Sequence, residues 1–202
     1  ITLFDLDNEF SLAYEMAVTN HNLKHEWSKA VINESRKLKD KNFDIESVID
    51  LRGKTFVTID GKSAKDFDDA VLGEKDEHGN LILYVAIADV ARYVDEGSHL
   101  DKEAFDRGTS VYFSQRVIPM LPEELSNDLC SLKPDEDRFC IVCKTTVRED
   151  GSLTDTSFFE AIINSKSRLT YPTVTREIQK KQFKQPYADS LSVLLKIYRR
   201  LK

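Results

Sequence analysis

Alternating apolar and polar positions predict strands over much of the middle of the chain. Three apolar runs have strand length, "KTFVTID", "DAVLGE" and "LILYVAIADV". The polar segment "DEHGN" at 76–80 separates the last two and predicts a turn. A second turn, "REDGS" at 148–152, joins "RFCIVCKTTV" to "LTDTSFFEAIINS". The pattern therefore predicts two strand–turn–strand units.

Helical spacing predicts helices on both sides of these strands. Residues 11–21 and 26–39 come first, and the second helix places Trp27, Ala30, Val31 and Leu38 close to one face. A short helix is expected in "SHLDKEAFDRG", where Ser98 can cap the start and Gly108 can end it. Two further helices are predicted in "PTVTREIQKK" and "YADSLSVLLKIYRRL". We expect a polar linker over 40–53 and a strand over 1–10, at the edge of a preceding domain.

Composition predicts a globular chain, and we expect no membrane-spanning or secretory segment in it. The 202 residues are 41% hydrophobic, and the longest apolar run, "LYVAIA", fits a buried strand. The net charge of −6 does not itself indicate a nucleic-acid binder, although residues 176–202 hold eight Lys or Arg and two acidic residues. Cys140 and Cys143 form a C-x-x-C pair inside a predicted strand, where they point to opposite faces. We therefore expect buried reduced thiols in a cytosolic protein rather than a zinc site.

The chemistry-bearing feature is "TIDGKSAKDFDDAVL", residues 58–72, with four aspartates in ten positions. Asp60 ends an apolar strand, and Asp66, Asp68 and Asp69 return toward the next one. Crowded carboxylates repel one another unless positive charge is present, and Mg²⁺ prefers such hard oxygen ligands. Carboxylate-bound divalent ions support phosphodiester hydrolysis. A solvated acidic loop is the alternative, and the surrounding apolar residues weigh against it: Val57, Ile59, Phe67 and Val71.

Other signals are weaker. His21 and His25 are four residues apart, but Asn22 stands where a zinc protease motif carries Glu. The scattered glycines form no phosphate-binding loop, and the aspartate spacing is not that of an EF-hand. The polar segment "LPEELSNDLCSLKPDED" is expected to line the site.

From residue 50 to residue 171, the chain resembles the ribonuclease II and ribonuclease R family of exoribonucleases. The resemblance rests on "DLRGKTFVTIDGKSAKDFDDAV", "LYVAIADVARYV", "GSHLDKEAFDRGTSVYF", "RVIPMLPEELSNDLCSLKPDEDRFCIVC" and "FFEAIINSKSRLTY", and is stronger toward the ribonuclease R branch. It implies processive, Mg²⁺-dependent degradation of single-stranded RNA from its 3′ end to nucleoside 5′-monophosphates, with Mn²⁺ as an alternative cofactor. It also implies an α+β fold, with a mixed, largely antiparallel sheet surrounded by helices, in a cytoplasmic protein.

The resemblance assigns roles to individual residues. Asp60 and Asp69 match aspartates that hold Mg²⁺, Asp66 matches a third ligand or catalytic carboxylate, and Asp68 matches the aspartate on which cleavage depends most. Tyr112 matches the tyrosine that stacks on the 3′-terminal base, and stacking suits a nuclease that ignores sequence. Two further RNA contacts are expected: Tyr171, from a looser match, and Arg168, which could equally cap a strand end.

The resemblance also divides the chain. Residues 1–10 are expected to be a remnant of an OB or cold-shock-like domain, 11–49 a helical connector, and 50–202 the N-terminal part of a truncated catalytic domain. Family members continue into further catalytic sequence, including an arginine, and carry flanking cold-shock and S1-type domains. We therefore expect a fragment that is nearly inactive alone. The alternatives are a non-catalytic RNA-binding or scaffold module on the same fold and, less favoured, a metal-dependent phosphodiesterase for another nucleic acid.

Overall fold

The computed structural model of the protein describes residues 9–41 and 43–202. The chain forms two compact units: residues 1–41 with 94–126, and residues 42–93 with 127–202. The second unit holds the sheet and the aspartates. Residues 94–126 group with the N-terminal helices, so the compact units interleave along the sequence. The domain boundaries expected from sequence stay predictions.

The first unit is mainly helical. Its helices are α1 (Glu9–Asn20), α2 (Lys29–Lys37), followed by the 3₁₀ turn η1 (Leu38–Asp40), and α3 (His99–Arg107). The predicted helix over 26–39 begins later than expected because Ser28 caps it, its hydroxyl accepting the N–H of Val31 (3.3 Å). Trp27 lies before that cap and stacks under the guanidinium of Arg107, 3.5 Å from its ring centre.

The ends of the short helix α3 confirm the sequence signals. The Ser98 hydroxyl accepts the N–H of Asp101 (3.0 Å), and Gly108 ends the helix in the left-handed conformation (φ 70°). Two short strands follow, β5 (Val111–Tyr112) and β6 (Val117–Ile118). At the other end of the unit, Glu9 and Phe10 belong to α1 rather than to the strand expected over 1–10. The rest of that prediction lies outside the described residues.

The second unit is built on one seven-stranded sheet. Its strands are β1 (Ile49–Asp50), β2 (Val57–Asp60), β3 (Asp69–Lys75), β4 (Leu81–Ala88), β7 (Asp137–Val147), β8 (Leu153–Asn164) and β9 (Ser167–Thr170). They lie in the order β1-β8-β7-β4-β3-β2-β9. The inner pairs are antiparallel, whereas β1 pairs with β8 and β9 with β2 in parallel. The expected mixed, largely antiparallel sheet is confirmed, and the two predicted hairpins are β3–β4 and β7–β8.

Smaller elements complete this unit. They are the 3₁₀ turn η2 (Val90–Arg92), the π-helical turn η3 (Leu125–Leu129), whose first two residues belong to the first unit, and the helices α4 (Tyr171–Lys180) and α5 (Ala188–Leu201). Cys140 and Cys143 lie in β7, and all three cysteines are free, with Cys140 buried. No helix in the described part of the chain is long and apolar enough to cross a bilayer.

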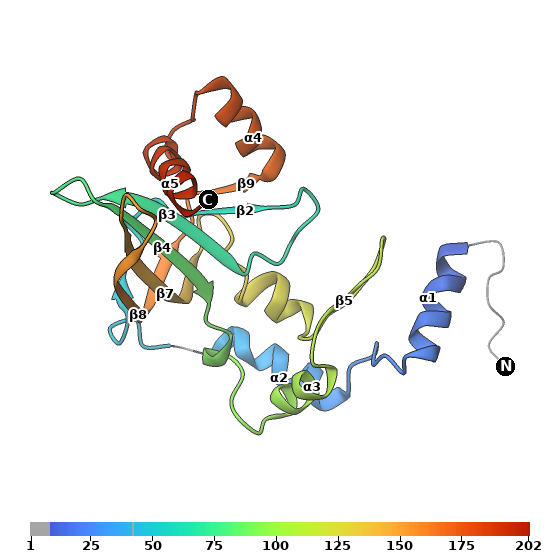
Figure 1. The fold of residues 1–202 in the computed structure, drawn as a ribbon. Coiled ribbons are helices and arrows are strands. Elements are labelled where there is room, and N and C mark those ends of the chain that lie inside the picture. The colour runs from blue at the N-terminus through green and yellow to red at the C-terminus, as the bar shows by residue number, and fades with distance from the viewer. Residues whose placement is uncertain (1–8, 42) are drawn as a thin grey trace. The chain divides into compact units, whose positions relative to one another are not determined.

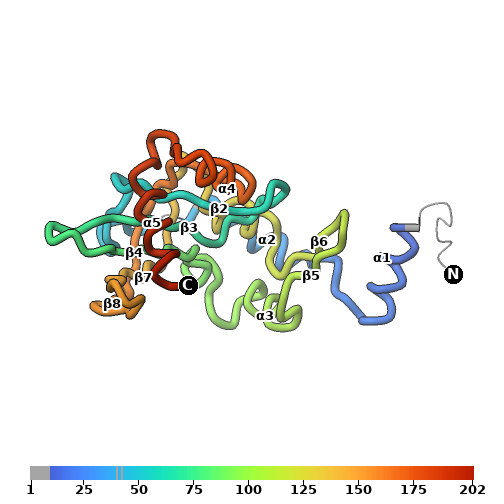
Figure 2. Tube along the Cα trace, turned by 45° about the horizontal axis from the view of Figure 1, so that its top comes forward, coloured from blue at the N-terminus to red at the C-terminus, as the bar shows by residue number. Residues whose placement is uncertain are grey.

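Helices α4 and α5 cover part of one face of the sheet. In both ribbon and tube views they lie against β2 and β3 (Figures 1 and 2). Val57, Leu169, Tyr187 and Leu191 form a buried cluster there, with half-buried Val71 against it. Burial of about 1.5–3 kcal/mol per large apolar side chain fixes β2 and β9 side by side under these helices. The strand that ends at Asp60 is therefore anchored in the core.

Beyond α5, the same face of the sheet is open. Ile87 and Ile141 are direct cross-strand neighbours, and both side chains are exposed. Ile87 also lies opposite Asp69, the first residue of β3. Because opposite residues of an antiparallel pair share a face, Asp69 emerges on this open part of the sheet.

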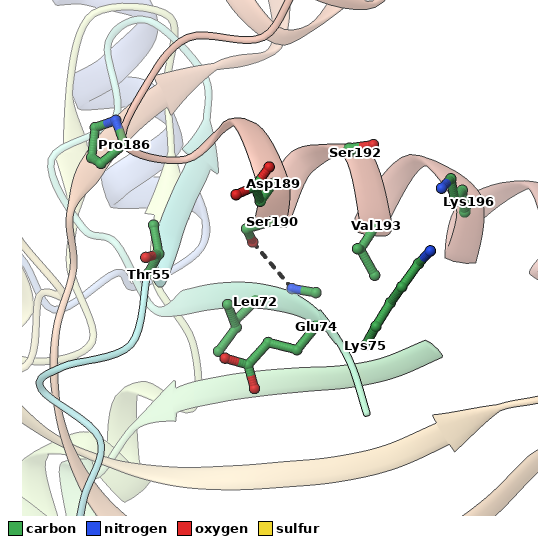
Figure 3. Close-up of a pocket in the computed structure, with 11 residues that line it drawn as sticks. Thr55, Leu72, Glu74, Lys75, Pro186, Asp189, Ser190, Ser192, Val193 and Lys196 are labelled. Carbon is green, nitrogen blue, oxygen red and sulfur yellow. Dashed lines mark hydrogen bonds between the residues drawn. The ribbon is translucent and has the colours of Figure 1, made fainter. Parts of the chain in front are cut away.

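Gly73 marks the closest approach between α5 and the sheet. Its N–H donates to the hydroxyl of Ser190 (3.1 Å; Figure 3). A Cβ at this position would lie 2.8 Å from the backbone N of Leu194 and 3.0 Å from the carbonyl O of Ser190. Only glycine therefore lets the helix backbone approach β3 this closely.

We expect Gly73→Ala to destabilise the protein by about 1–3 kcal/mol, because the added methyl group must push α5 away from the sheet. Gly53→Ala is the matched control, since a Cβ at Gly53 has no neighbour within 4 Å. Urea unfolding followed by circular dichroism measures both. Equal midpoints for the two variants would show that α5 does not pack on Gly73 as described.

Candidate active site

The four aspartates lie on the loop between β2 and β3 and at its two ends. Strand β2 ends at Asp60 and β3 begins at Asp69, while Asp66 and Asp68 lie between them. Figure 1 shows this loop leaving the end of β2 and returning to β3. We call residues 60–69 the aspartate loop. Because both flanking strands are anchored, its ends are held on the rigid part of the sheet.

The returning half of the loop is fastened through Phe67, whose ring is buried. The Phe67 N–H donates to the hydroxyl of Ser131 (3.0 Å), and its carbonyl accepts the N–H of Leu132 (2.8 Å). The Ser131 hydroxyl in turn donates to the carbonyl of Lys65 (3.0 Å). Asp66 and Asp68 therefore flank a residue that is fixed by its ring and by both of its backbone polar groups.

The aspartates act on one another electrostatically. Burial raises the pKa of Asp60 above its usual value, and the charges of Asp69 and Asp66 raise it further, while Arg168 opposes this. The pKa of Asp68 is also raised, first by desolvation and then by Asp66, Asp69 and Asp60, although part of its side chain reaches solvent. The structure thus brings the four predicted carboxylates into one negative cluster.

Asp60 carries the clearest sign of an incomplete environment. Its Oδ2 atom is buried and finds no hydrogen-bond partner among the described residues. A buried carboxylate oxygen without a partner is costly, and a cation or a donor offsets that cost. Asp60 is therefore suited to bind a positive group.

The donor set fits a divalent cation whose shell the protein supplies only in part. Within the described chain, no three His, Cys, Asp or Glu side chains already form a group that could enclose a metal ion. Mg²⁺ does not need such a group, because it keeps several waters and binds through one or two carboxylates plus phosphate oxygens. The unpartnered Oδ2 of Asp60 and the neighbouring charge of Asp69 meet that requirement. Asp60 and Asp69, with Asp66 nearby, are the residues that would hold the ion.

Two aromatic residues predicted to contact RNA are exposed. Tyr171 is the first residue of α4 and follows Thr170, which pairs with Asp60 across β9 and β2. Its side chain is 61% exposed, so an aromatic face lies next to the end of β2. Tyr112 lies in β5 of the other unit and is 65% exposed. Their RNA contacts stay predictions.

Arg168, for which the sequence left an RNA contact and a strand-end cap equally open, binds the backbone of the aspartate loop; its RNA contact stays a prediction. Its Nη2 group donates to the carbonyls of Gly61 (3.2 Å), Lys62 (2.7 Å) and Ala64 (3.3 Å). The sequence placed Ser131 in a polar segment expected to line the site. It did not predict that Ser131 and Arg168 bind the backbone of the aspartate loop. No sequence signal marks these contacts, because any residue supplies a backbone carbonyl.

The groove between α5 and β3 is separate from the aspartate loop. It has a volume of about 490 Å³ and is lined by charges of both signs, including Glu74, Lys75, Asp189 and Lys196 (Figure 3). Glu74 is already paired with Lys54 (2.6 Å). The part of β3 that lines the groove begins at Leu72, about 10 Å along the strand from Asp69 at about 3.3 Å per residue, and none of the four aspartates is among its lining residues. The groove therefore takes no part in the aspartate site.

Comparison with known proteins places the chain in a family. The sequence profile of the RNB domain matches residues 48–202. The chain belongs to the RNB family. It is 44% identical over 194 residues to Ribonuclease R of Vibrio parahaemolyticus and 45% identical over 190 residues to Ribonuclease R of Escherichia coli. Each match covers 93% of this chain and 23% of the relative, so the chain spans about a quarter of their length.

A solved structure of another protein confirms the fold of this chain. Mycoplasma genitalium RNase R in complex with double-stranded RNA superposes with a TM-score of 0.87 at 30% identity. That match covers 96% of this chain and 35% of the other. The mixed sheet and its helices therefore belong to an architecture that an RNase R also has.

We expect Asp68→Asn to raise the denaturation midpoint in buffer that contains a chelator, because it removes one charge from a mutually repelling cluster. Added salt should reduce the gain, since salt screens the repulsion. Glu77→Gln is the matched control: it removes one negative charge from the exposed β3–β4 turn. Urea unfolding at low and high ionic strength measures the effect. If Asp68→Asn behaves like the control, repulsion in the aspartate loop is negligible.

Proposed function

We propose that the chain carries the Mg²⁺-binding part of the catalytic domain of a 3′-to-5′ exoribonuclease. The substrate would be single-stranded RNA, degraded processively to nucleoside 5′-monophosphates in the cytoplasm, with cold-shock and S1-type domains flanking the catalytic domain in the complete enzyme. The observation that carries the proposal is the negative cluster on the aspartate loop of an RNB-family chain. RNA as substrate is supported by the names of the relatives and by the RNA in the complex of the Mycoplasma protein.

The residues divide the work by their environment. Asp60 and Asp69 stand at the anchored ends of the loop and hold Mg²⁺, or Mn²⁺ in its place, with Asp66 contributing from between them. When bound, the ion lowers the pKa of the attacking water and offsets charge on the phosphate oxygens. Asp68 orients that water and accepts its proton. Asp68 is suited to this role because a carboxylate can accept a proton from water and because its side chain reaches solvent.

The aromatic residues serve binding. Exposed Tyr112 stacks on the 3′-terminal base, and exposed Tyr171 contacts the RNA near the end of β2. Each stacked base is worth about 1–3 kcal/mol and is tolerant of sequence. The alternative, a non-catalytic RNA-binding module, keeps these contacts and loses the chemistry. The presence of all four aspartates weighs against it.

Mg²⁺ titrated calorimetrically into the chain should bind with an affinity that falls at least about tenfold in Asp60→Asn and in Asp69→Asn. Both substitutions keep the shape of the side chain and remove a charged oxygen ligand. Glu77→Gln, in the exposed turn, should bind Mg²⁺ as the unaltered chain does. Unchanged binding in both aspartate variants would place the metal elsewhere.

The catalytic role is tested in a chimera, in which this chain replaces the matching segment of Escherichia coli Ribonuclease R. The folded chimera should shorten RNA from its 3′ end. Asp68→Asn should lower the single-turnover rate by about 10²–10⁴-fold, as expected for loss of a general base. RNA affinity should persist or rise, because a charge that repels phosphate is gone.

The control for this measurement is again Glu77→Gln, which should leave both quantities unchanged. A folded chimera that binds RNA but does not shorten it would favour the non-catalytic module. Collapse of affinity with an unchanged single-turnover rate for bound RNA would make Asp68 a binding residue instead of a catalytic one.

A further inference from the structure

Arg168 is placed inside the bend of the aspartate loop by the topology of the sheet. It lies on β9, which runs parallel to β2, and its direct partner in the register is Thr58. The side chain therefore starts beside the strand that delivers Asp60. Its Nη2 group reaches three carbonyls, those of Gly61, Lys62 and Ala64. Three carbonyls from four consecutive residues can converge on one nitrogen only if the backbone curves around it.

The same guanidinium also contacts the returning half of the loop. Its central carbon lies 5.3 Å from the centre of the Phe67 ring. The backbone of Phe67 is held by Ser131 and Leu132. Arg168 thus touches the outgoing half through hydrogen bonds and the returning half through a cation–π contact. Ser131 is a second fastening, which bridges Lys65 and Phe67.

A loop with this composition needs such a fastening. Its four carboxylates repel one another, and its inward carbonyls need a donor because they face the interior of the bend. Arg168 answers both needs at once, since a guanidinium stays protonated and carries several donors in a rigid plane. Its positive charge also lowers the pKa of Asp60, whereas the neighbouring carboxylates raise it.

We infer that Arg168 is a positioning residue of the active site, which holds the aspartate loop in the shape that presents Asp60 and Asp69 to the cation. Ser131 supports the same shape through its hydrogen bonds to Lys65 and Phe67. The effect on the cation rests on the proposed function. The hydrogen bonds by which Arg168 holds the loop do not depend on it. The inference also gives Arg168 a role other than the RNA contact expected from sequence. A site that must be accurate to about half an ångström needs supporting residues of this kind.

The test compares Arg168→Met, which keeps an unbranched apolar stem and loses the charge and the donors, with Arg168→Lys, which keeps a charge and three N–H donors. Arg176→Met, at an exposed position on α4, is the matched control. Hydrogen–deuterium exchange is measured without metal on the peptide that covers residues 61–69. Calorimetric titration with Mg²⁺ is then run on the same proteins.

In Arg168→Met, exchange in the aspartate loop should rise at least about tenfold, while exchange in the β7–β8 hairpin stays unchanged. Affinity for Mg²⁺ should fall about tenfold, as is common when a residue that orients a ligand is removed. Arg168→Lys should restore most of both. Ser131→Ala should show the same local effect on a smaller scale, and it keeps the test informative if Arg168→Met does not fold.

Kinetics and RNA binding of the chimera with Escherichia coli Ribonuclease R distinguish a positioning role of Arg168 from a direct RNA contact. If Arg168 is a positioning residue, Arg168→Met lowers kcat and leaves KM for RNA nearly unchanged. If RNA affinity falls while Mg²⁺ affinity and loop exchange stay as in the unaltered protein, Arg168 is an RNA contact and the inference is overturned. Absence of Mg²⁺ binding by the unaltered chain would instead refute the proposed metal site, and the exchange data would still decide whether Arg168 fastens the loop.

Discussion

Mutual repulsion among Asp60, Asp66, Asp68 and Asp69 is the constraint on which the rest of the site depends. Four negative charges on one short loop would move apart in a flexible segment. Here the loop begins and ends on anchored strands, and Phe67 is fixed between two of the carboxylates. Burial raises the pKa values of Asp60 and Asp68, and the repulsion among the carboxylates raises them further. The fold does not relieve this repulsion, so a bound cation would stabilise the loop.

The sheet supplies that rigidity at the edge where β9 pairs with β2. Most of its pairs are antiparallel, but β9 joins β2 in parallel from more than a hundred residues away in sequence. This pairing brings Arg168 under the loop and Tyr171 beside the end of β2. Helices α4 and α5 then bury the outer face of β2 and β9. The site is therefore assembled from local strands and closed by a distant one.

Much of the fold was predictable from local sequence. The hairpin β3–β4 follows from apolar runs around a turn, and Ser98 and Gly108 mark the ends of α3 as expected. The predictions were wrong where tertiary contacts override local pattern. Trp27 suited a helical face, but it stacks on Arg107, and the helix starts only after Ser28. The short strands β1 and β9 were missed because two to four residues carry too little periodicity to identify a strand.

The sequence by itself determined the chemistry of the site: four carboxylates between two apolar strands, in a pattern that resembles one nuclease family. That information is local, because the charges and the strands that carry them are neighbours in the chain. Only the tertiary structure decided what surrounds those carboxylates. The unpartnered Oδ2 of Asp60, the Ser131 bridge and the three carbonyls around Arg168 arise from segments that meet only on folding. Backbone groups are the same at every residue, so no sequence pattern can announce which of them an arginine will bind.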